Sequence, residues 1–341
     1  MTTQLSQTPL EGSIREPGEG GKDEAGFEPE AGQASGPFDP SRLTPLGPGA
    51  RAVAVAVIVI PLLGFALAVA RAWGDGLAGL EAGLLIALYV VSGLGITIGF
   101  HRYLTHAAFR TSSVLRALLT IAGSLAMQGP AIYWVAIHRR HHRFSDKPGD
   151  PHSPHLEEDH GIKGLLYGWW NAHVGWMIRG ERPLARRFAP DLLRDPLVRS
   201  LDRLYVVWIA LGLGGPALLG YAVGGPERAW SCFLWGGLAR VFLFHHVTWS
   251  INSICHLFGS QAFDSRDDST NNPIFAVLAF GEGWHNNHHA FPRSARHGLL
   301  PGQFDLSWLV IRALERLGLV WDVRLPSAEA IERKRLAPAG S

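Results

Sequence analysis

AVAVAVIVIPLLGFALAVA, residues 52–70, is an uninterrupted apolar run bounded by Arg51 and Arg71. At about 1.5 Å per residue, a helix of this length matches the ~30 Å hydrocarbon layer of a membrane. A second apolar run, Leu80 to Phe100, follows after a short link and contains one acidic residue, Glu81. The two runs together predict a transmembrane hairpin.

A second pair of apolar runs lies much later in the chain, at residues 204–223 and from 229 to about 250, with the turn GGPE (224–227) between them. This pattern predicts a second hairpin. We therefore expect an all-α integral membrane protein with four transmembrane helices. The apolar stretch 114–136 is broken by a charge and by Gln-Gly-Pro (128–130), so we expect an interfacial or cap helix there instead.

The composition agrees with a membrane protein. Of the 341 residues, 47% are hydrophobic and 18% charged, whereas a typical soluble domain has about a quarter charged residues. The formal net charge of +2 disfavours nucleic-acid binding, because such proteins carry a large excess of Lys and Arg. The two cysteines, Cys232 and Cys255, lie in apolar surroundings and predict no disulfide framework.

Charge and composition also predict the domain limits and the orientation. Residues 1–48 are rich in Gly, Pro and Glu without apolar periodicity, so we expect a disordered tail before a membrane domain at 49–325 and a C-terminal tail at 326–341. The segment 101–203 carries 15 of the 31 Lys and Arg residues. The positive-inside rule then places this segment and both termini of a multi-pass protein in the cytoplasm.

Histidines form the second unusual feature. Nine of the 16 stand in four short segments, each just after an apolar segment or helix: His101 and His106; His138, His141 and His142; His256; and His285, His288 and His289. In H-x-x-H-H on a helix, positions i, i+3 and i+4 share a face, while the adjacent pair points about 100° apart and thus toward two different metals. In H-x-x-x-x-H, positions i and i+5 diverge on a regular helix, so we place this motif where the second membrane helix ends and the chain bends.

One zinc ion needs three or four protein ligands, so nine clustered histidines imply two metal ions. Imidazole ligands suit iron, copper, nickel or zinc, and a paired site beside an apolar conduit indicates redox chemistry on a lipid chain, for which we expect iron. The other histidines are expected to be ordinary core or surface residues: His152, His155, His160, His173, His245, His246 and His297.

The order of these histidine motifs resembles the membrane-bound fatty acyl desaturase family, of the stearoyl-CoA (Δ9) desaturase type, over roughly residues 50–325. The resemblance rests on four elements: Gly95-Ile96-Thr97 before His101; Trp134 before His138; Thr248-Trp249 and Asn252-Ser253 before His256; and Gly281-Glu282-Gly283-Trp284-His285 running on to Phe291-Pro292. It implies a cytoplasmic helical cap that holds two Fe ions on the nine histidines, with Asn252 reaching one iron through water.

The implied reaction is the O2- and two-electron-dependent introduction of a cis double bond into a saturated acyl chain. Carboxylates are expected to orient the histidine rings, with Asp146, Asp150, Asp267, Asp268 and Glu282 as candidates and Glu282 the strongest. The sequence has no His-Pro-Gly-Gly element and no four-Cys site, so electrons must come from a separate donor, either a ferredoxin or a cytochrome b5-type protein with its reductase. A basic cytoplasmic face would steer an acidic electron carrier toward the protein.

The resemblance also implies substrate contacts. It assigns the bend of the acyl tunnel to Gln128, Trp134 and Thr248, with Trp249 beside them, which predicts Δ9 chemistry; Tyr89 and Gly93, four residues apart on one helix face, would close its far end. Relatives contact acyl-CoA with charged pairs at two places where this chain has Ala136-Ile137 and Gly180-Glu181. Long-chain acyl-CoA and acyl-lipid therefore both stay open as substrates.

Three other functions are compatible with parts of the sequence. A carboxylate-bridged di-iron bundle needs two Glu-x-x-His motifs, which occur at 157–160 and 282–285, but four membrane runs do not suit a soluble bundle. A non-enzymatic transporter or metal or haem carrier would place its polar groups within the membrane, whereas these histidines follow the helix ends. A lipid hydroxylase or another oxygenase on the same scaffold is the nearest alternative.

Overall fold

The computed structural model describes residues 43–155 and 161–336, which all lie in one compact unit, Gly36–Ser341. Residues 1–42 of the expected N-terminal tail lie outside the described residues. The described chain is mostly helical, and its elements are α1 Pro48–Asp75, α2 Gly79–Leu94, π-helix η2 Gly95–Thr105, β1 Arg110–Thr111, α3 Ser113–Ser124, α4 Ala131–Phe144, α5 Ile162–Trp170, π-helix η3 Asn171–Gly175, α6 Trp176–Arg179, α7 Ala185–Phe188, α8 Pro190–Arg194, α9 Pro196–Arg203, α10 Tyr205–Cys232, π-helix η4 Phe233–Ala239, α11 Arg240–Ser253, 3-10 helix η5 Ile254–His256, α12 Pro273–Leu278, α13 His285–Ala290, α14 Leu306–Arg316, β2 Val320–Trp321 and α15 Ala328–Lys334.

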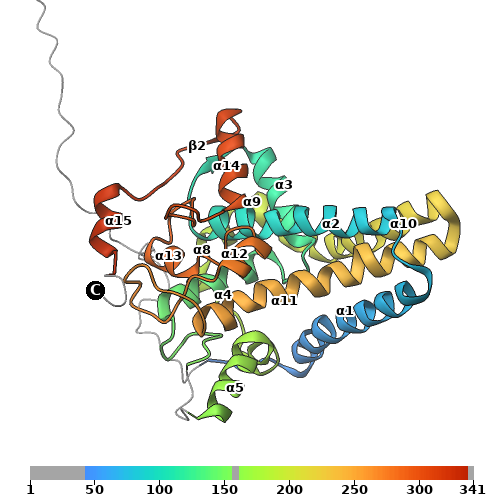
Figure 1. Cartoon of the computed structure of the whole chain (residues 1–341), viewed down its shortest axis with the longest axis horizontal. Helices are drawn as coiled ribbons and strands as arrows, with labels where there is room; N and C mark the ends of the chain where they lie inside the picture. The colour runs from blue at the N-terminus through green and yellow to red at the C-terminus, as the bar shows by residue number, and fades with distance from the viewer. Residues whose placement is uncertain (1–42, 156–160, 337–341) are drawn as a thin grey trace, which may run out of the picture. The chain divides into compact units, whose positions relative to one another are not determined.

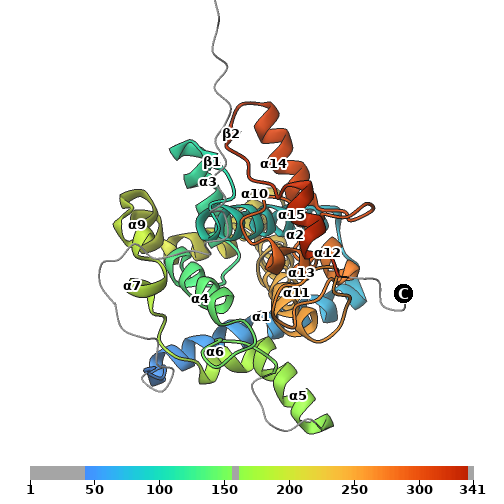
Figure 2. The same cartoon turned by 90° about the vertical axis from the view of Figure 1, so that its left-hand side faces the viewer.

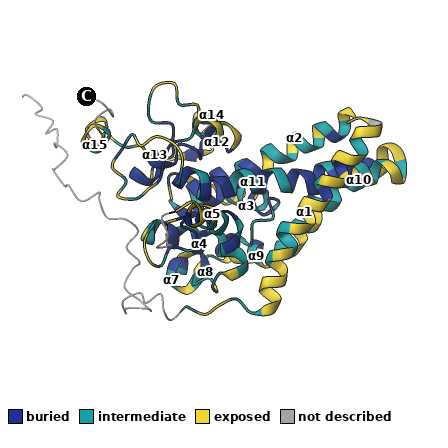
Figure 3. Ribbon diagram, turned by 60° about the horizontal axis from the view of Figure 1, so that its bottom comes forward, coloured by how far each residue is buried: buried dark blue, intermediate teal, exposed yellow. Residues whose placement is uncertain are grey.

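Three helical stretches among the described residues are long and apolar enough to cross a membrane: Pro48–Gly74, Gly79–Thr105 and Tyr205–His256. Their surfaces carry exposed apolar side chains, such as Val53 at 63% and Leu63 at 61% exposure on α1. In Figure 3 these outer faces are yellow, whereas the region around α4 and α13 is mostly dark blue and teal. The apolar exposure is what lipid-facing helices require.

The third stretch is not one straight helix, because it reverses direction at Gly225, whose φ of 73° is rare for residues with a side chain. After the reversal, the Arg228 guanidinium pairs with Glu81 of α2 at 3.3 Å between Nε and Oε1. A second ion pair, Arg71 with Glu227 at 3.1 Å, joins the end of α1 to the same turn. The two tight turns therefore lie at the same end of the long helices (Figure 1).

The short helices lie at the other end. Figure 2 looks onto it, with α4 on one side and α12 and α13 on the other. The stretch 114–136 forms two elements here: α3 has only 12 residues, and α4 starts at Ala131 after a non-helical break. The stretch is thus not a single membrane crossing. Helix α3 packs closely on η2, since a Cβ on Gly95 would meet the backbone of Gly123.

The π-helix η2 ends the second apolar stretch. The His106 N–H donates to the His101 carbonyl at 3.2 Å, an i→i+5 bond of the kind that defines a π-helix. The wider turn places the two rings 4.9 Å apart, centroid to centroid. The predicted position at the helix end is confirmed, but a π-helix rather than a bend brings the two side chains together.

Both ends of the described chain pack on the domain. The Leu46 N–H donates to the Gly180 carbonyl at 3.0 Å, and the Asp264 N–H donates to the carbonyl of Lys334 in α15 at 2.8 Å. The two-residue strands β1 and β2 pair antiparallel, with Thr111 opposite Val320. Residues 43–48 and 326–336 therefore contain ordered contacts where the sequence predicts tails.

Candidate metal centre

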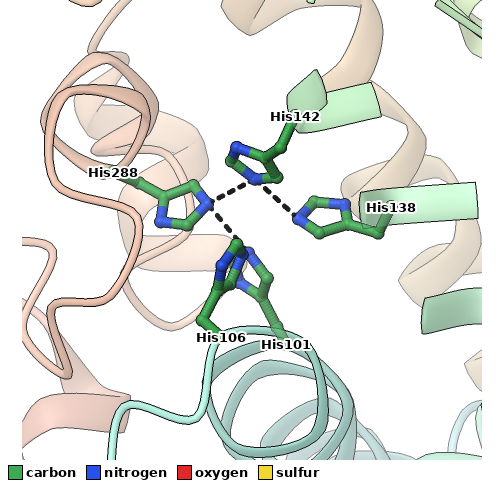
Figure 4. A group of neighbouring side chains, drawn as sticks. All are labelled: His101, His106, His138, His142 and His288. Carbon is green, nitrogen blue, oxygen red and sulfur yellow. Dashed lines mark hydrogen bonds between the residues drawn. The ribbon is translucent and has the colours of Figure 1, made fainter. Parts of the chain in front are cut away.

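Five histidines from three elements point toward one another (Figure 4): His101 and His106 from η2 and its end, His138 and His142 from α4, and His288 from α13. One ring nitrogen of each lies within 4.8 Å of those of the others. The Nε2 atoms of His288 and His142 are 2.9 Å apart, and those of His142 and His138 are 3.0 Å apart. We refer to these five residues as the first histidine group.

Four further histidines form a second group: His141 from α4, His256 from η5, and His285 and His289 from α13. All four are buried. The Nε2 atoms of His256 and His285 are 3.0 Å apart, and those of His141 and His289 are 3.4 Å apart. The two groups together contain all nine histidines of the predicted ligand set.

Helix geometry explains how the motifs are divided. On α4, His138 and His142 are four residues apart and share the first group, while His141 turns to the second. On α13 the division is reversed, because His285 and His289 share the second group and His288 turns to the first. Adjacent histidines thus lie in different groups, as the spacing predicts.

Four carboxylates accept hydrogen bonds from the outer ring nitrogens. Glu282 binds Nδ1 of His101, Asp150 binds that of His141 at 3.0 Å, Asp146 binds that of His256 at 2.8 Å, and Asp267 binds that of His289 at 2.6 Å. In each neutral ring the proton then lies on Nδ1, so that Nε2 presents a lone pair to the group. Asp268, the fifth candidate, is exposed and reaches Asp146 only through its backbone N–H.

The four carboxylates are charged at neutral pH, and four rings of the first group, His106, His138, His142 and His288, are neutral. Burial raises the pKa of Asp150, but the His141 ring outweighs burial and lowers that pKa to about 2. Burial holds the pKa of His138, His142 and His288 well below that of an exposed imidazole, and neighbouring rings lower it further. Uncharged rings are the form in which imidazole binds a metal.

The donor set fits metal ions. Two nitrogens bound to one ion at about 2.1 Å and at right angles are about 3.0 Å apart, which is the separation between neighbouring Nε2 atoms of the first group. Facing lone pairs repel each other unless a proton or a cation lies between them. The buried ring nitrogens that have no hydrogen-bond partner among the described residues also include His106 Nε2 and His285 Nδ1.

Asn252 lies in the last turn of α11, four residues before His256, and is half-buried. Its side-chain amide has no hydrogen-bond partner among the described residues.

Three of the predicted substrate contacts form one chain. The Gln128 side chain donates Nε2–H to Thr248 Oγ1 at 2.5 Å and accepts from Trp134 Nε1 at 3.3 Å. The Trp134 ring in turn stacks on His138, with centroids 4.9 Å apart. Trp134 therefore lies directly against the first histidine group, and Gln128 and Thr248 are joined to Trp134 by hydrogen bonds. Trp249 packs elsewhere, against the rings of His173, His245 and His246.

The other two predicted substrate contacts, Tyr89 and Gly93, lie on one face of α2. The Tyr89 ring meets Phe280 edge to face at 5.7 Å, and its hydroxyl donates to the Leu278 carbonyl at 3.0 Å. A Cβ on Gly93 would collide with the same Phe280 ring and approach Phe244 to 3.1 Å. Phe280 therefore already fills the space beside Gly93.

The sequence did not single out every histidine near the centre. His297 lies within 4.8 Å of ligand atoms of His101 and Glu282, and His152 lies in the same way near His141 and Asp150. Both are in irregular segments, so helical periodicity offers no signal for them. His155 accompanies Asp146 and Asp268 near the surface, and His160 lies outside the described residues.

Among the described residues, the Glu-x-x-His motif at 282–285 does not bring its two side chains to one site. Glu282 holds His101 of the first group, whereas His285 belongs to the second. The other motif, at 157–160, lies outside the described residues. Both candidate metal-binding groups consist of histidines, instead of the carboxylates that a carboxylate-bridged centre needs.

A cavity of about 240 Å³ lies beside α4 and is lined by Ile137, Gly180 and Glu181, positions where relatives are expected to contact CoA. Its charged lining residues are two of each sign: Arg140, Arg179, Asp150 and Glu181. Arg140 pairs with Glu181 at 2.8 Å, and Asp150 binds His141. Among the described lining residues, therefore, there is no excess of positive charge for a polyphosphate.

A sequence model of the family described as "Fatty acid desaturase" matches residues 76–306. A hex-5-enoyl-[acyl-carrier protein] acetylenase of Moorena producens is 48% identical over 82% of this chain and 88% of its own. An sn-1 stearoyl-lipid 9-desaturase of Anabaena variabilis is 43% identical over 71% of this chain and 82% of its own. An acyl-CoA 5-desaturase of Anemone leveillei is 41% identical over 74% of each chain.

Proposed function

The chain belongs to the fatty acid desaturase family, and from this premise we propose that it forms a cis double bond, at or near Δ9, in a long-chain saturated acyl group. It is thus an oxidoreductase that acts on fatty acyl chains. The proposed reaction uses O2 and two electrons. The observation that carries it is the pair of histidine groups, each large enough for one metal ion, beside the Gln128–Trp134 contact.

We propose that the two groups hold two iron ions. The first would be bound by His101, His106, His138, His142 and His288, and the second by His141, His256, His285 and His289, with Asn252 reaching it through water. Bound in this way, two iron ions supply the activation of O2 and the oxidising power that removal of two hydrogens from unactivated methylenes requires.

The chain's own residues hold this constellation rigid. The carboxylates of Glu282, Asp150, Asp146 and Asp267 fix the tautomers and ring orientations of one histidine each. Most ligand rings are buried, so water is kept from the reacting methylenes. The Trp134 ring, stacked on His138, is placed to set how closely an acyl chain approaches the first group.

We propose four membrane crossings arranged as two hairpins. The stretch Tyr205–His256 has 52 residues and would be about 78 Å long as one helix, far more than the ~30 Å hydrocarbon layer. Its reversal at Gly225, and the ion pairs that tie both turns together, support two crossings there. The basic segment 101–203 lies at the opposite end, with the histidines, so that end is proposed to face the cytoplasm as a cap.

Two hairpins with the histidine end in the cytoplasm would place both termini in the cytoplasm as well. The membrane desaturase domain is proposed to run from about residue 43 to 336 instead of 49 to 325, since both extensions hydrogen-bond to the domain. The residues before 43 are proposed to be a tail without a role in the reaction.

Among carriers of the acyl chain, we propose a glycerolipid rather than CoA. The balanced charge of the cavity at Ile137 and Glu181 suits an uncharged headgroup or ester better than the phosphates of CoA. The similarity to a stearoyl-lipid 9-desaturase supports both the carrier and the position. The similarity to an acetylenase adds a second candidate, removal of hydrogen from an existing double bond.

We also propose that a separate one-electron carrier, of the ferredoxin or cytochrome b5 class, supplies the electrons. A cavity of about 380 Å³ opens next to Asp146 and Asp267, the carboxylates that hold His256 and His289. Lys147 and Arg266, on its rim, are exposed. The lining also carries four aspartates, Asp146, Asp264, Asp267 and Asp268, so the support for a carrier here is the short path to the second histidine group and not an attraction for an acidic protein.

The test is expression in a desaturase-deficient host, followed by gas chromatography and mass spectrometry of the acyl chains. We expect a cis-monounsaturated C16 or C18 product at Δ9 in the wild type and none in His138→Ala. Membranes supplied in parallel with labelled acyl-CoA and labelled phospholipid then distinguish the carriers. A hydroxylated product would favour the oxygenase alternative, and an alkyne from an unsaturated substrate would favour the acetylenase.

A further inference from the structure

His297 is a tenth histidine at the metal centre. It lies in an irregular segment after α13, is fully buried, and stands outside the H-x-x-H-H motifs. Its ring centroid is 4.4 Å from that of His288 and 5.3 Å from that of His101. Its Nδ1 lies 3.7 Å from Oε1 of Glu282, the carboxylate that holds His101.

Neither ring nitrogen of His297 has a hydrogen-bond partner among the described residues. Burying such a polar ring without partners costs free energy that an apolar side chain of similar size would avoid. Within the described ranges, Nδ1 faces Glu282, and the ring packs against His288 and His101 of the first histidine group. We therefore expect the His297 ring to gain its hydrogen-bond partner when metal ions bind to the histidine groups.

The backbone around His297 is fixed from both sides. Its N–H donates to Asp305 Oδ2 at 2.7 Å, and its carbonyl accepts from Asn287 Nδ2 at 2.8 Å. Asp305 is in turn held by the fully buried Arg102, which also donates to Glu282 at 2.5 Å. The same guanidinium therefore positions both the segment that carries His297 and the carboxylate that His297 faces.

The charges around Glu282 favour a further hydrogen-bond donor. Arg102 is shared between two buried carboxylates, Glu282 and Asp305, so one positive charge faces two negative charges. Glu282 also accepts from His101. A further N–H from His297 would complete the hydrogen bonding of this carboxylate, and a movement of about 0.5 Å brings the 3.7 Å separation into hydrogen-bond range.

We propose that His297 is a positioning residue of the first histidine group. It donates Nδ1–H to Glu282 and so fixes the carboxylate that orients His101, while its ring supports His288. This inference rests on the proposed metal-binding function, and it extends the set of residues that hold the centre beyond the nine predicted ligands.

The experiment measures metal binding in addition to turnover. The wild type, His297→Phe and His297→Asn are purified in detergent, and Fe(II) and Co(II) affinity, metal content per chain and the Co(II) absorption spectrum are recorded. Phe keeps the ring volume without N–H, whereas Asn places an N–H near the position of Nδ1. We expect metal affinity of the first group to fall about 10- to 100-fold in His297→Phe, with substantial recovery in His297→Asn.

His245 supplies a matched control, because it is also buried with an unpartnered ring nitrogen but lies in α11, outside both histidine groups. His245→Asn is expected to leave metal content and spectrum unchanged. A folded His297→Phe protein with wild-type affinity and spectrum would overturn the proposal. If His297→Phe does not fold, His297→Asn is compared with His297→Gln. Equal metal affinities and Co(II) spectra in these two variants overturn the proposal, whereas a higher metal affinity in His297→Asn than in His297→Gln supports it.

The outcome also separates this inference from the proposed function. A wild-type chain that binds no iron contradicts the proposed function itself. A wild-type chain that binds iron at both groups, together with an unaltered His297→Phe protein, removes only the role of His297.

Discussion

Replacing Phe280 with Ala is expected to lengthen the acyl chain that the protein accepts. The Phe280 ring fills the space beside Gly93 and meets Tyr89 edge to face at 5.7 Å. Tyr89 and Gly93 are the residues that the family resemblance places at the end of the acyl tunnel. If the methyl end of the substrate points toward this face, the Phe280 ring, and not an open space at Gly93, limits its length.

The size of the effect follows from the burial of methylenes. Each buried methylene contributes about 0.8 kcal/mol, and about 1.4 kcal/mol corresponds to a tenfold change in an equilibrium or rate ratio. A C20 chain has two methylenes more than C18, which is worth about 1.6 kcal/mol if the room left by the ring takes both. The preference for C20 over C18 is then expected to rise about 14-fold in Phe280→Ala.

The assay is a competition between C18 and C20 substrates in membranes, with products separated by gas chromatography and normalised to the amount of protein. Phe242→Ala is the matched control, because the Phe242 ring stacks on Phe65 of α1, with ring centroids 4.6 Å apart, and not on Tyr89 or Phe280. Gly93→Leu is expected to reduce the protein level without a new product length, since its side chain collides with Phe280. An unchanged C20 to C18 ratio in a well-expressed Phe280→Ala protein would refute this reasoning.

Four further predictions concern the centre and its support. His285→Ala is expected to abolish desaturation in the deficient host while the protein still inserts, because no neighbour can take over its position; normal unsaturated lipid would exclude it as a ligand. Asp267→Asn is expected to lower metal affinity about 10- to 100-fold, measured by competition with a chelator, whereas Asp268→Asn, whose side chain does not hold a ligand ring, leaves it unchanged. Arg102→Met is expected to destabilise the protein by about 3–5 kcal/mol, because two buried carboxylates lose their guanidinium; denaturation in mixed micelles measures this, with the exposed pair Arg110–Asp322 as control. Deletion of residues 1–42 is expected to leave activity nearly intact, and a large loss would show a role for that segment.

The sequence was sufficient for the features that depend on helical periodicity. The H-x-x-H-H spacing predicts that adjacent histidines point to different metals, and the structure places His141 and His142, like His288 and His289, in different groups. Apolar run lengths predict the long helices. Both patterns are local, so they are visible without knowledge of tertiary packing.

The remaining features depend on contacts between distant segments. Asp150 and Asp267 stand in irregular segments, and only the fold brings each to the outer nitrogen of a particular ring. The convergence of His101 and His106 needs a π-helix, which hydrophobic periodicity does not reveal. Phe280 reaches Gly93 across a sequence separation of 187 residues (280 − 93), so the filled space there was not predictable from α2 alone.

Metal content of the purified full-length chain tests the central claim most directly. Iron is measured by mass spectrometry per chain in the wild type, in His142→Ala of the first group and in His285→Ala of the second, alongside haem absorbance. Two separate groups predict close to two iron ions in the wild type, close to one in each variant, and no haem. A wild-type content of one or none after loading with Fe(II), or variants that both retain two, would contradict it.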